Sequence, residues 1–193
     1  MIRSWKYKDR VYTFITEEQL PEIVKILHDP EVEKYLYFAP VTLDRFRGYT
    51  LPIIEGQKKA LQEGRNPDSA VFAVMEDDEL LGVCGVSEMP DCHNVSMVGC
   101  QLKRSAWGKG VGVSTLEFVI HYAQSYSKVR KLFGDCMTEN IGSARIMEKC
   151  GFSFEGVIKE KYEVDGHLLN NSWYGLKMED VTALPQGAVQ ELQ

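Results

Sequence analysis

Several features are missing from this 193-residue sequence, and each absence narrows what the protein can be. The chain contains no apolar run of about 20 residues, so the sequence predicts no membrane-spanning helix. No apolar segment follows the basic N-terminal residues, so we expect no secretory signal. Five cysteines without a C-x-x-C pair are typical of reduced thiols rather than of a disulfide framework or a zinc site. These absences predict a cytoplasmic protein without a metal and without a membrane partner.

Acidic residues are also missing from one long stretch. The formal net charge is -6, which disfavours general nucleic-acid binding, because such binding needs a strongly basic face. Residues 92–116, however, contain no Asp or Glu and include Lys103, Arg104 and Lys109. Taken alone, these three cations are best interpreted as a solvated surface. Beside a glycine-rich loop, they favour an anionic ligand.

That loop is the stretch around which the chain is organised, Trp107-Gly108-Lys109-Gly110-Val111-Gly112. It lies between a predicted strand that ends near residue 102 and a predicted helix over residues 113–126. Glycine at every second position allows positive φ angles and a close approach of the backbone to a ligand. The first amides of the following helix have no intrahelical partner and favour phosphate. The loop therefore predicts a phosphate-bearing ligand.

Two familiar nucleotide motifs are absent from the loop. Reading G-x-G-x-x-G from Gly108 places Val113 at the last glycine, and reading it from Gly110 places Thr115 there. A P-loop needs Ser or Thr after its lysine, but Gly110 follows Lys109. The loop is therefore neither a dinucleotide fingerprint nor a P-loop.

The order of predicted elements indicates an α+β fold with a mixed sheet. Periodicity predicts strands over residues 10–15, 70–75, 80–87, 95–102 and 131–137, and a final hairpin of 152–164 with 168–176. Helices are expected over 16–28, 31–38, 42–63 with an interruption at Pro52, 113–126 and 141–150. We expect one domain, residues 1–178, followed by a flexible tail, residues 179–193.

Two segments resemble a known family. LKRSAWGKGVG at residues 102–112 and NIGSARIMEKCGF at residues 140–152 are similar to the GNAT superfamily of acyl-CoA-dependent N-acetyltransferases. Their spelling is most similar to the Rim-type branch, the ribosomal-protein N-terminal acetyltransferases. The resemblance implies a mixed, mostly antiparallel central sheet flanked by helices. It also implies that this sheet is splayed between the fourth and fifth strands.

The resemblance further implies that acetyl-CoA binds where the sheet splays. The main chain of Gln101, Leu102 and Lys103 would pair with the pantetheine arm. The loop and the first turn of the next helix would hold the pyrophosphate, through Trp107, Gly108, Lys109, Gly110, Val111, Gly112 and Val113. Asn140 and Ser143 would lie near the thioester, although Asn140 also fits a plain helix N-cap.

Acid and base are harder to assign. Met147 stands where many relatives carry a tyrosine acid, so Ser143 becomes the candidate to hydrogen-bond the sulfur, with helix capping as its alternative role. Met97 stands where relatives often carry a glutamate base. Glu88 is then the first catalytic candidate for the base. Glu163, His93 or bulk water remain alternatives for taking the proton from the amine.

The sequence thus predicts an enzyme that transfers an acetyl group from acetyl-CoA to a primary amine. The acceptor is a protein N-terminus, a peptide, or a small polyamine or aminoglycoside-like molecule, and the acidic balance suits a cationic one. A non-catalytic acyl-CoA-binding module is the main alternative, because Met97 and Met147 replace the usual acid and base. A nucleotide-binding protein is a third and weaker hypothesis. The oligomeric state is left open, a homodimer included.

Overall fold

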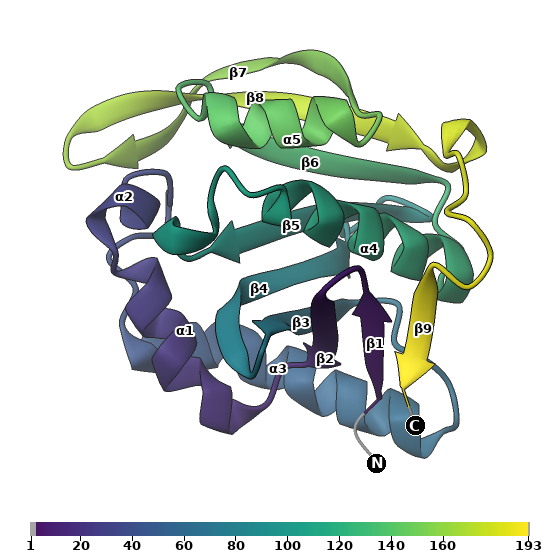
Figure 1. The fold of residues 1–193 in the computed structure, drawn as a ribbon. Helices are drawn as coiled ribbons and strands as arrows, with labels where there is room; N and C mark the ends of the chain where they lie inside the picture. Colours follow the sequence, from purple (N-terminus) through teal and green to yellow (C-terminus); the bar gives the residue numbers. More distant parts are fainter. Residues whose placement is uncertain (1–2, 193) are drawn as a thin grey trace.

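The computed structural model describes residues 3–192 and is built on one nine-stranded sheet (Figure 1). The strands follow the spatial order β7-β8-β6-β5-β4-β3-β2-β1-β9. Neighbouring strands are antiparallel except for β5 and β6. The strands are β1 (Ser4–Tyr7), β2 (Arg10–Phe14), β3 (Ala70–Glu76), β4 (Glu79–Glu88), β5 (Val95–Leu102), β6 (Lys131–Met137), β7 (Ser153–Val164), β8 (His167–Lys177) and β9 (Val189–Leu192).

Helices cover both faces of the sheet. One face packs against the first three helices through a cluster that includes Leu20, Ile23 and Val83, and the other packs against α4 and α5. None of the helices in residues 3–192 is long and apolar enough to cross a membrane. The helices are α1 (Leu20–Leu27), α2 (Pro30–Glu33), α3 (Leu43–Gln62), α4 (Val111–Tyr126) and α5 (Ile141–Lys149), with short 3-10 turns at Glu17–Gln19, Arg104–Ala106 and Met178–Asp180.

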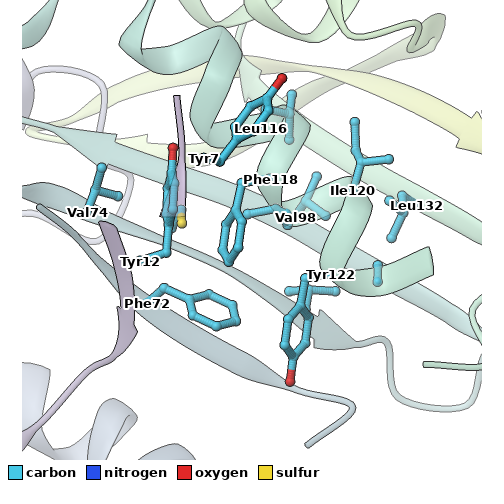
Figure 2. Packing of buried hydrophobic residues seen from close by; sticks show 14 of the residues in the cluster. Tyr7, Tyr12, Phe72, Val74, Val98, Leu116, Phe118, Ile120, Tyr122 and Leu132 are labelled. Atoms are coloured by element: carbon cyan, nitrogen blue, oxygen red, sulfur yellow. The ribbon is translucent and has the colours of Figure 1, made fainter. Parts of the chain in front are cut away.

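An aromatic core fixes α4, the helix that follows the glycine loop, onto the sheet (Figure 2). Phe118 of α4 stacks on Tyr12 with ring centroids 3.9 Å apart and meets Phe72 edge to face at 5.1 Å. One turn later, Tyr122 packs on Phe72 and donates a hydrogen bond to the Pro67 carbonyl at 2.8 Å. Aromatic pairs of this kind bury large areas and have defined geometry. They therefore hold α4 in a fixed place on the sheet.

The sheet opens where its strands change direction. β5 and β6 are parallel and pair at three positions, Val95–Lys131, Ser96–Leu132 and Met97–Phe133. No further pair links these strands within residues 3–192, and they diverge toward the glycine loop (Figure 1). The mixed sheet and its splay confirm the predicted fold class. The strands counted as fourth and fifth from the sequence are β5 and β6, because the prediction missed β1.

The N-terminal strand and the C-terminal residues correct two expectations. Ser4–Tyr7 forms a hairpin with β2 through a turn at Lys8, whose φ is 55°. We expected a flexible tail over residues 179–193, but Val189–Leu192 pairs with β1 along its whole length. The expectation of an unstructured tail is therefore wrong for β9. Such short strands lack a clear period of their own and are stabilised by pairing with a distant neighbour.

The third helix corrects a smaller expectation. We predicted an interruption at Pro52, yet α3 runs without a break from Leu43 to Gln62. Buried Ile54 and Gln57 hold this helix on the sheet, and the Gln57 side chain accepts a hydrogen bond from the Val71 amide at 2.8 Å. Packing of this kind outweighs the local cost of a proline.

Candidate active site at the β5–β6 divergence

The three glycines of the loop have different roles in the structure. Gly108 and Gly110 have φ angles of +75° and +78°, in the left-handed region that favours glycine, and Gly110 is the N-cap of α4. A Cβ at either position would meet no atom of the described residues within 4 Å. Gly112 has no such open space, because a Cβ there would lie 2.5 Å from Ile146 Cδ1 of α5. Two glycines therefore shape an open loop, and the third lets two helices approach.

The start of α4 has the features of an anion site. The helix begins at Val111, two residues earlier than predicted, so Val111, Gly112 and Val113 supply its first amides. The first turn contains no acidic side chain. Unpaired amides and the positive end of the helix dipole favour a phosphate at this place. The open space around Gly108 and Gly110 leaves room for one.

Trp107 fixes the beginning of the loop. Its indole Nε1 donates a hydrogen bond to the Leu102 carbonyl at 2.9 Å, and the Arg104 guanidinium lies 4.9 Å from the ring centroid. Tyr35, which follows α2, packs against the Trp107 ring with the two ring centroids 6.5 Å apart. The side chain of Trp107 thus joins the end of β5 to the loop, which gives this predicted binding residue a structural role.

The last residues of β5 present one paired and one unpaired edge. On the β4 side, Gln101 pairs with Val83, Leu102 with Gly82, and the Lys103 amide donates to the Leu81 carbonyl. On the β6 side, no strand of residues 3–192 pairs with residues 98–102. The Lys103 ammonium forms an ion pair with Glu79. An unpaired strand edge of this kind can accept an extended ligand by main-chain hydrogen bonds.

Across the divergence, Asn140 and Ser143 lie at the start of α5. The Asn140 side chain accepts a hydrogen bond from the Ser143 amide at 3.0 Å, so Asn140 is the N-cap of this helix. The cap uses the amide of Ser143 and not its hydroxyl. Burial raises the pKa of the Cys136 thiol on β6 to about 11, and a hydrogen bond from Ser143 partly offsets that rise. Ser143 and Cys136 are therefore neighbours.

Met147 is a core residue. It is 4% exposed, and its Sδ fills the space over Gly134, where a Cβ would lie only 2.6 Å away. Met97, the other methionine at a position of expected chemistry, pairs with Phe133 at the last position that joins β5 and β6. Neither thioether can donate or remove a proton at neutral pH.

The three candidate bases are all exposed. Glu88 is exposed at the end of β4, opposite Ser96, which is six residues along β5 from Leu102, a span of about 20 Å. His93 is exposed in the turn before β5, and Glu163 is exposed on β7 opposite Leu168. The structure brings the loop, Asn140 and Ser143 to the two strands that diverge, whereas the candidate bases lie at the end of β4, in the turn before β5 and on β7.

A polar and aromatic group near the divergence was not predicted from the sequence. The Lys161 ammonium of β7 lies 3.0 Å from Asp135 Oδ2 of β6 and 3.2 Å from Asn171 Oδ1 of β8. It also lies 4.6 Å from the ring centroids of both Tyr162 and Trp173. We call these five residues the Asp135 cluster. The sequence signal was faint, an acidic residue within a strand that is otherwise mostly apolar.

Comparison with known proteins bears on the site as a whole. Residues 11–153, most of the chain, match the acetyltransferase (GNAT) domain family. The chain is 25% identical over 153 residues to the uncharacterized N-acetyltransferase p20 of Bacillus licheniformis, which covers 77% of this chain and 81% of that protein. It is 26% identical over 90 residues to the ribosomal-protein-serine acetyltransferase of Escherichia coli, covering 47% of this chain and 50% of that one.

A solved structure has a similar fold. The spermidine N-acetyltransferase of Vibrio cholerae, determined with CoA and spermine, aligns with a TM-score of 0.74 at 16% identity. The alignment covers 89% of this chain and 96% of that one. At this identity the likeness concerns the fold alone.

Proposed function

Because the chain belongs to the acetyltransferase (GNAT) family and is an acetyl-CoA-dependent N-acetyltransferase, we propose that it acetylates a primary amine on a cationic acceptor. The observation that carries this proposal is the divergence of β5 from β6 beside the N-terminus of α4. That arrangement offers an unpaired strand edge and an anion site within one stretch of chain. An extended ligand with a phosphate at one end matches both.

The donor site is assigned to β5 and the loop. The main chain of residues 101–103 pairs with the pantetheine arm, and the amides of residues 108–113 bind the pyrophosphate. Trp107 acts indirectly, since its indole holds the loop against the Leu102 carbonyl. Such backbone contacts do not depend on the identity of the side chains, because an amide donates whatever residue carries it.

Ser143 is proposed as the donor of a hydrogen bond to the CoA sulfur as it leaves. Its hydroxyl is not used by the helix cap, which belongs to Asn140. We assign removal of the amine proton to water rather than to Glu88, because Glu88 is exposed at the far end of β4. The backbone of β5 beside the thioester stabilises the developing negative charge on oxygen.

The net charge of the protein and the substrates of similar proteins narrow the range of candidate acceptors. The net charge of -6 favours cationic partners. One similar structure contains spermine, and one relative acetylates a ribosomal protein, so both small polyamines and protein N-termini are candidate acceptors. They share a primary ammonium that must lose a proton before it attacks the thioester.

The test measures donor binding and turnover separately. Isothermal titration should detect binding of acetyl-CoA but not of ATP. Free thiol should then be released with at least one member of a panel containing spermidine, an aminoglycoside and a peptide with a free N-terminal serine, and not with the N-acetylated peptide. Binding of ATP without acetyl-CoA would refute the donor site. Tight acetyl-CoA binding without turnover on any amine would instead support a non-catalytic acyl-CoA-binding module, consistent with Met97 and Met147.

A further inference from the structure

The Asp135 cluster surrounds one ammonium group, that of Lys161. The Lys161 ammonium contacts a carboxylate oxygen, an amide oxygen and the faces of two aromatic rings. These are the groups that recognise an alkylammonium ion, through charge-assisted hydrogen bonds and cation–π contacts. The Lys161 and Asp135 side chains are only 22% and 19% exposed, so water screens their attraction less than at a surface pair.

The cluster lies beside the proposed reaction centre. Asp135 is two residues beyond Phe133, the last residue of β6 that pairs with β5, so it belongs to the diverging part of the strand. Alternation along β6 places Asp135 on the face opposite Leu132 and Cys136, which pack toward α4 and α5. The cluster therefore faces the side of the sheet that carries the first three helices.

A loop after α2 closes over the cluster on that side. Tyr37 stacks on Tyr162 with ring centroids 4.0 Å apart and planes 3° from parallel. Burial, followed by the charge of Asp135, raises the pKa of Tyr162 to about 12, so the ring is neutral at physiological pH. Tyr37 is 48% exposed, so the stack is reachable from solvent. An aliphatic amine could lie along these rings with its ammonium at Asp135.

The backbone of β7 is shaped to place Lys161. The register of β7 against β8 shifts between Ile158 and Tyr162, and Glu160 has a φ of 52°. The Glu160 amide donates to Asn170 Oδ1 at 2.9 Å, which holds the irregular segment. Irregularities of this kind redirect side chains and are frequent beside active sites.

We propose that the Asp135 cluster is the subsite for the acceptor's ammonium, and that Lys161 is its resident occupant, which an acceptor must displace. The inference rests on the proposed function. A tethered ligand competes at an effective concentration of roughly millimolar or more. Lys161 therefore weakens acceptor binding and restricts it to amines that compete well for a carboxylate. The shared chemistry is a primary ammonium, from a polyamine or from a protein N-terminus.

The decisive variant is Lys161→Met, which keeps the aliphatic stem and removes the charge. In the presence of saturating CoA, which cannot react, the variant should bind spermidine or an N-terminal serine peptide at least about tenfold more tightly by isothermal titration. The KM for the acceptor should fall by a similar factor with little change in kcat. Comparison of the two probes identifies the source of the ammonium. Lys159→Met is the matched control, because Lys159 is an exposed lysine on the same strand.

Two further variants keep the test decisive. Lys161→Gln removes the charge but retains a hydrogen-bond donor for Asp135, and it replaces Lys161→Met if the latter unfolds. Asp135→Asn should weaken acceptor binding at least tenfold while leaving CoA affinity unchanged. Unchanged or weaker amine binding by a folded Lys161 variant with normal CoA affinity would overturn the inference. Failure of the wild-type protein to bind CoA or to release thiol would refute the proposed function instead.

Discussion

The two strands that diverge, β5 and β6, carry sites built in different ways. On the β5 side, consecutive residues of one loop provide main-chain amides at the start of α4. On the β6 side, Asp135, Lys161 and Asn171 come from three separate strands, and Tyr37 adds a ring from a loop more than 90 residues away from Asp135 in the sequence. One site is made of backbone and the other of side chains.

The difference predicts where sequence change is tolerated. A backbone site depends on φ angles and on space, so it is sensitive at Gly108 and Gly110 and indifferent to many side chains around them. A side-chain site changes its ligand when one charged group changes. We therefore expect the donor to be a fixed property of the fold, and the acceptor to be set by a few residues of β6, β7 and β8.

The largest expected effect breaks the donor site alone. Gly110→Glu would place a carboxylate at the N-terminus of α4, in the space proposed for the pyrophosphate. Acetyl-CoA affinity should fall by roughly 100-fold or more in isothermal titration, since like charges repel where a favourable anion site existed. Spermidine binding to the protein without CoA should change little.

A matched variant separates this effect from backbone strain. Gly64 also has a φ of +75° and open space around it, but it follows the end of α3. Gly64→Glu introduces the same strain and the same charge away from the site. Equal losses of acetyl-CoA affinity in both variants, or normal affinity in Gly110→Glu, would remove the pyrophosphate from the assigned loop.

The contrast between the two sites also explains what could be predicted from the sequence. The donor side is local, so its glycines, the following helix and the N-cap at Asn140 are visible as a continuous pattern. The splay of the sheet followed from the same motifs, because they resemble those of a known family. Thr42 caps α3 through an equally local contact, since its hydroxyl accepts a hydrogen bond from the Arg45 amide at 3.2 Å.

The acceptor side could not be predicted, because its residues meet only through the sheet. Lys161 and Asp135 are 26 positions apart, and nothing near either one signals a partner. The shift of register in β7 that aims Lys161 is also invisible in a period-two pattern. The same reason hides β9, whose four residues form a strand only because β1 offers them an edge.

Alkylation of Cys136 tests how strongly the thiol on β6, between the two sites, is buried. Burial raises the pKa of this thiol to about 11, against an ordinary value near 8.5, so its thiolate is roughly 300-fold scarcer at neutral pH. Iodoacetamide should therefore modify Cys136 at least 100-fold more slowly than a peptide of residues 131–137. Peptide mapping by mass spectrometry should find the rate rising about tenfold per pH unit from pH 7 to 10. A plateau below pH 9 would contradict the raised pKa.

The same reaction reports which ligand covers β6. Cys136 and Ser143 lie on the face toward α5, whereas Asp135 lies on the other. CoA should slow alkylation of Cys136, and spermidine alone should not. Protection of Cys136 by spermidine without CoA would place the acceptor on the α5 face of β6 and would contradict its assignment to Asp135.

Ser143→Ala tests the link between the two sites at the reacting sulfur. The substitution removes the hydroxyl but keeps the amide that Asn140 caps, so α5 should remain intact. We expect kcat to fall about tenfold, with acetyl-CoA affinity within twofold of the wild type, because the lost hydrogen bond forms mainly as the thiolate leaves. A thioester with a more acidic thiol should restore most of the lost rate. An unaltered kcat would leave Ser143 without a catalytic role.

Asn140 provides the smallest effect and the cleanest separation of support from chemistry. Asn140→Ala removes the cap of α5 and should cost about 1 kcal/mol of the free energy of unfolding, or roughly 2–4 °C in Tm for a protein of this size. Asn140→Asp preserves an acceptor for the Ser143 amide and should retain the stability. If Asn140 acts only as a cap, both variants should keep the wild-type kcat at temperatures well below Tm. If kcat falls in Asn140→Asp while Tm does not, the Asn140 side chain also contacts the donor, as is proposed for Ser143.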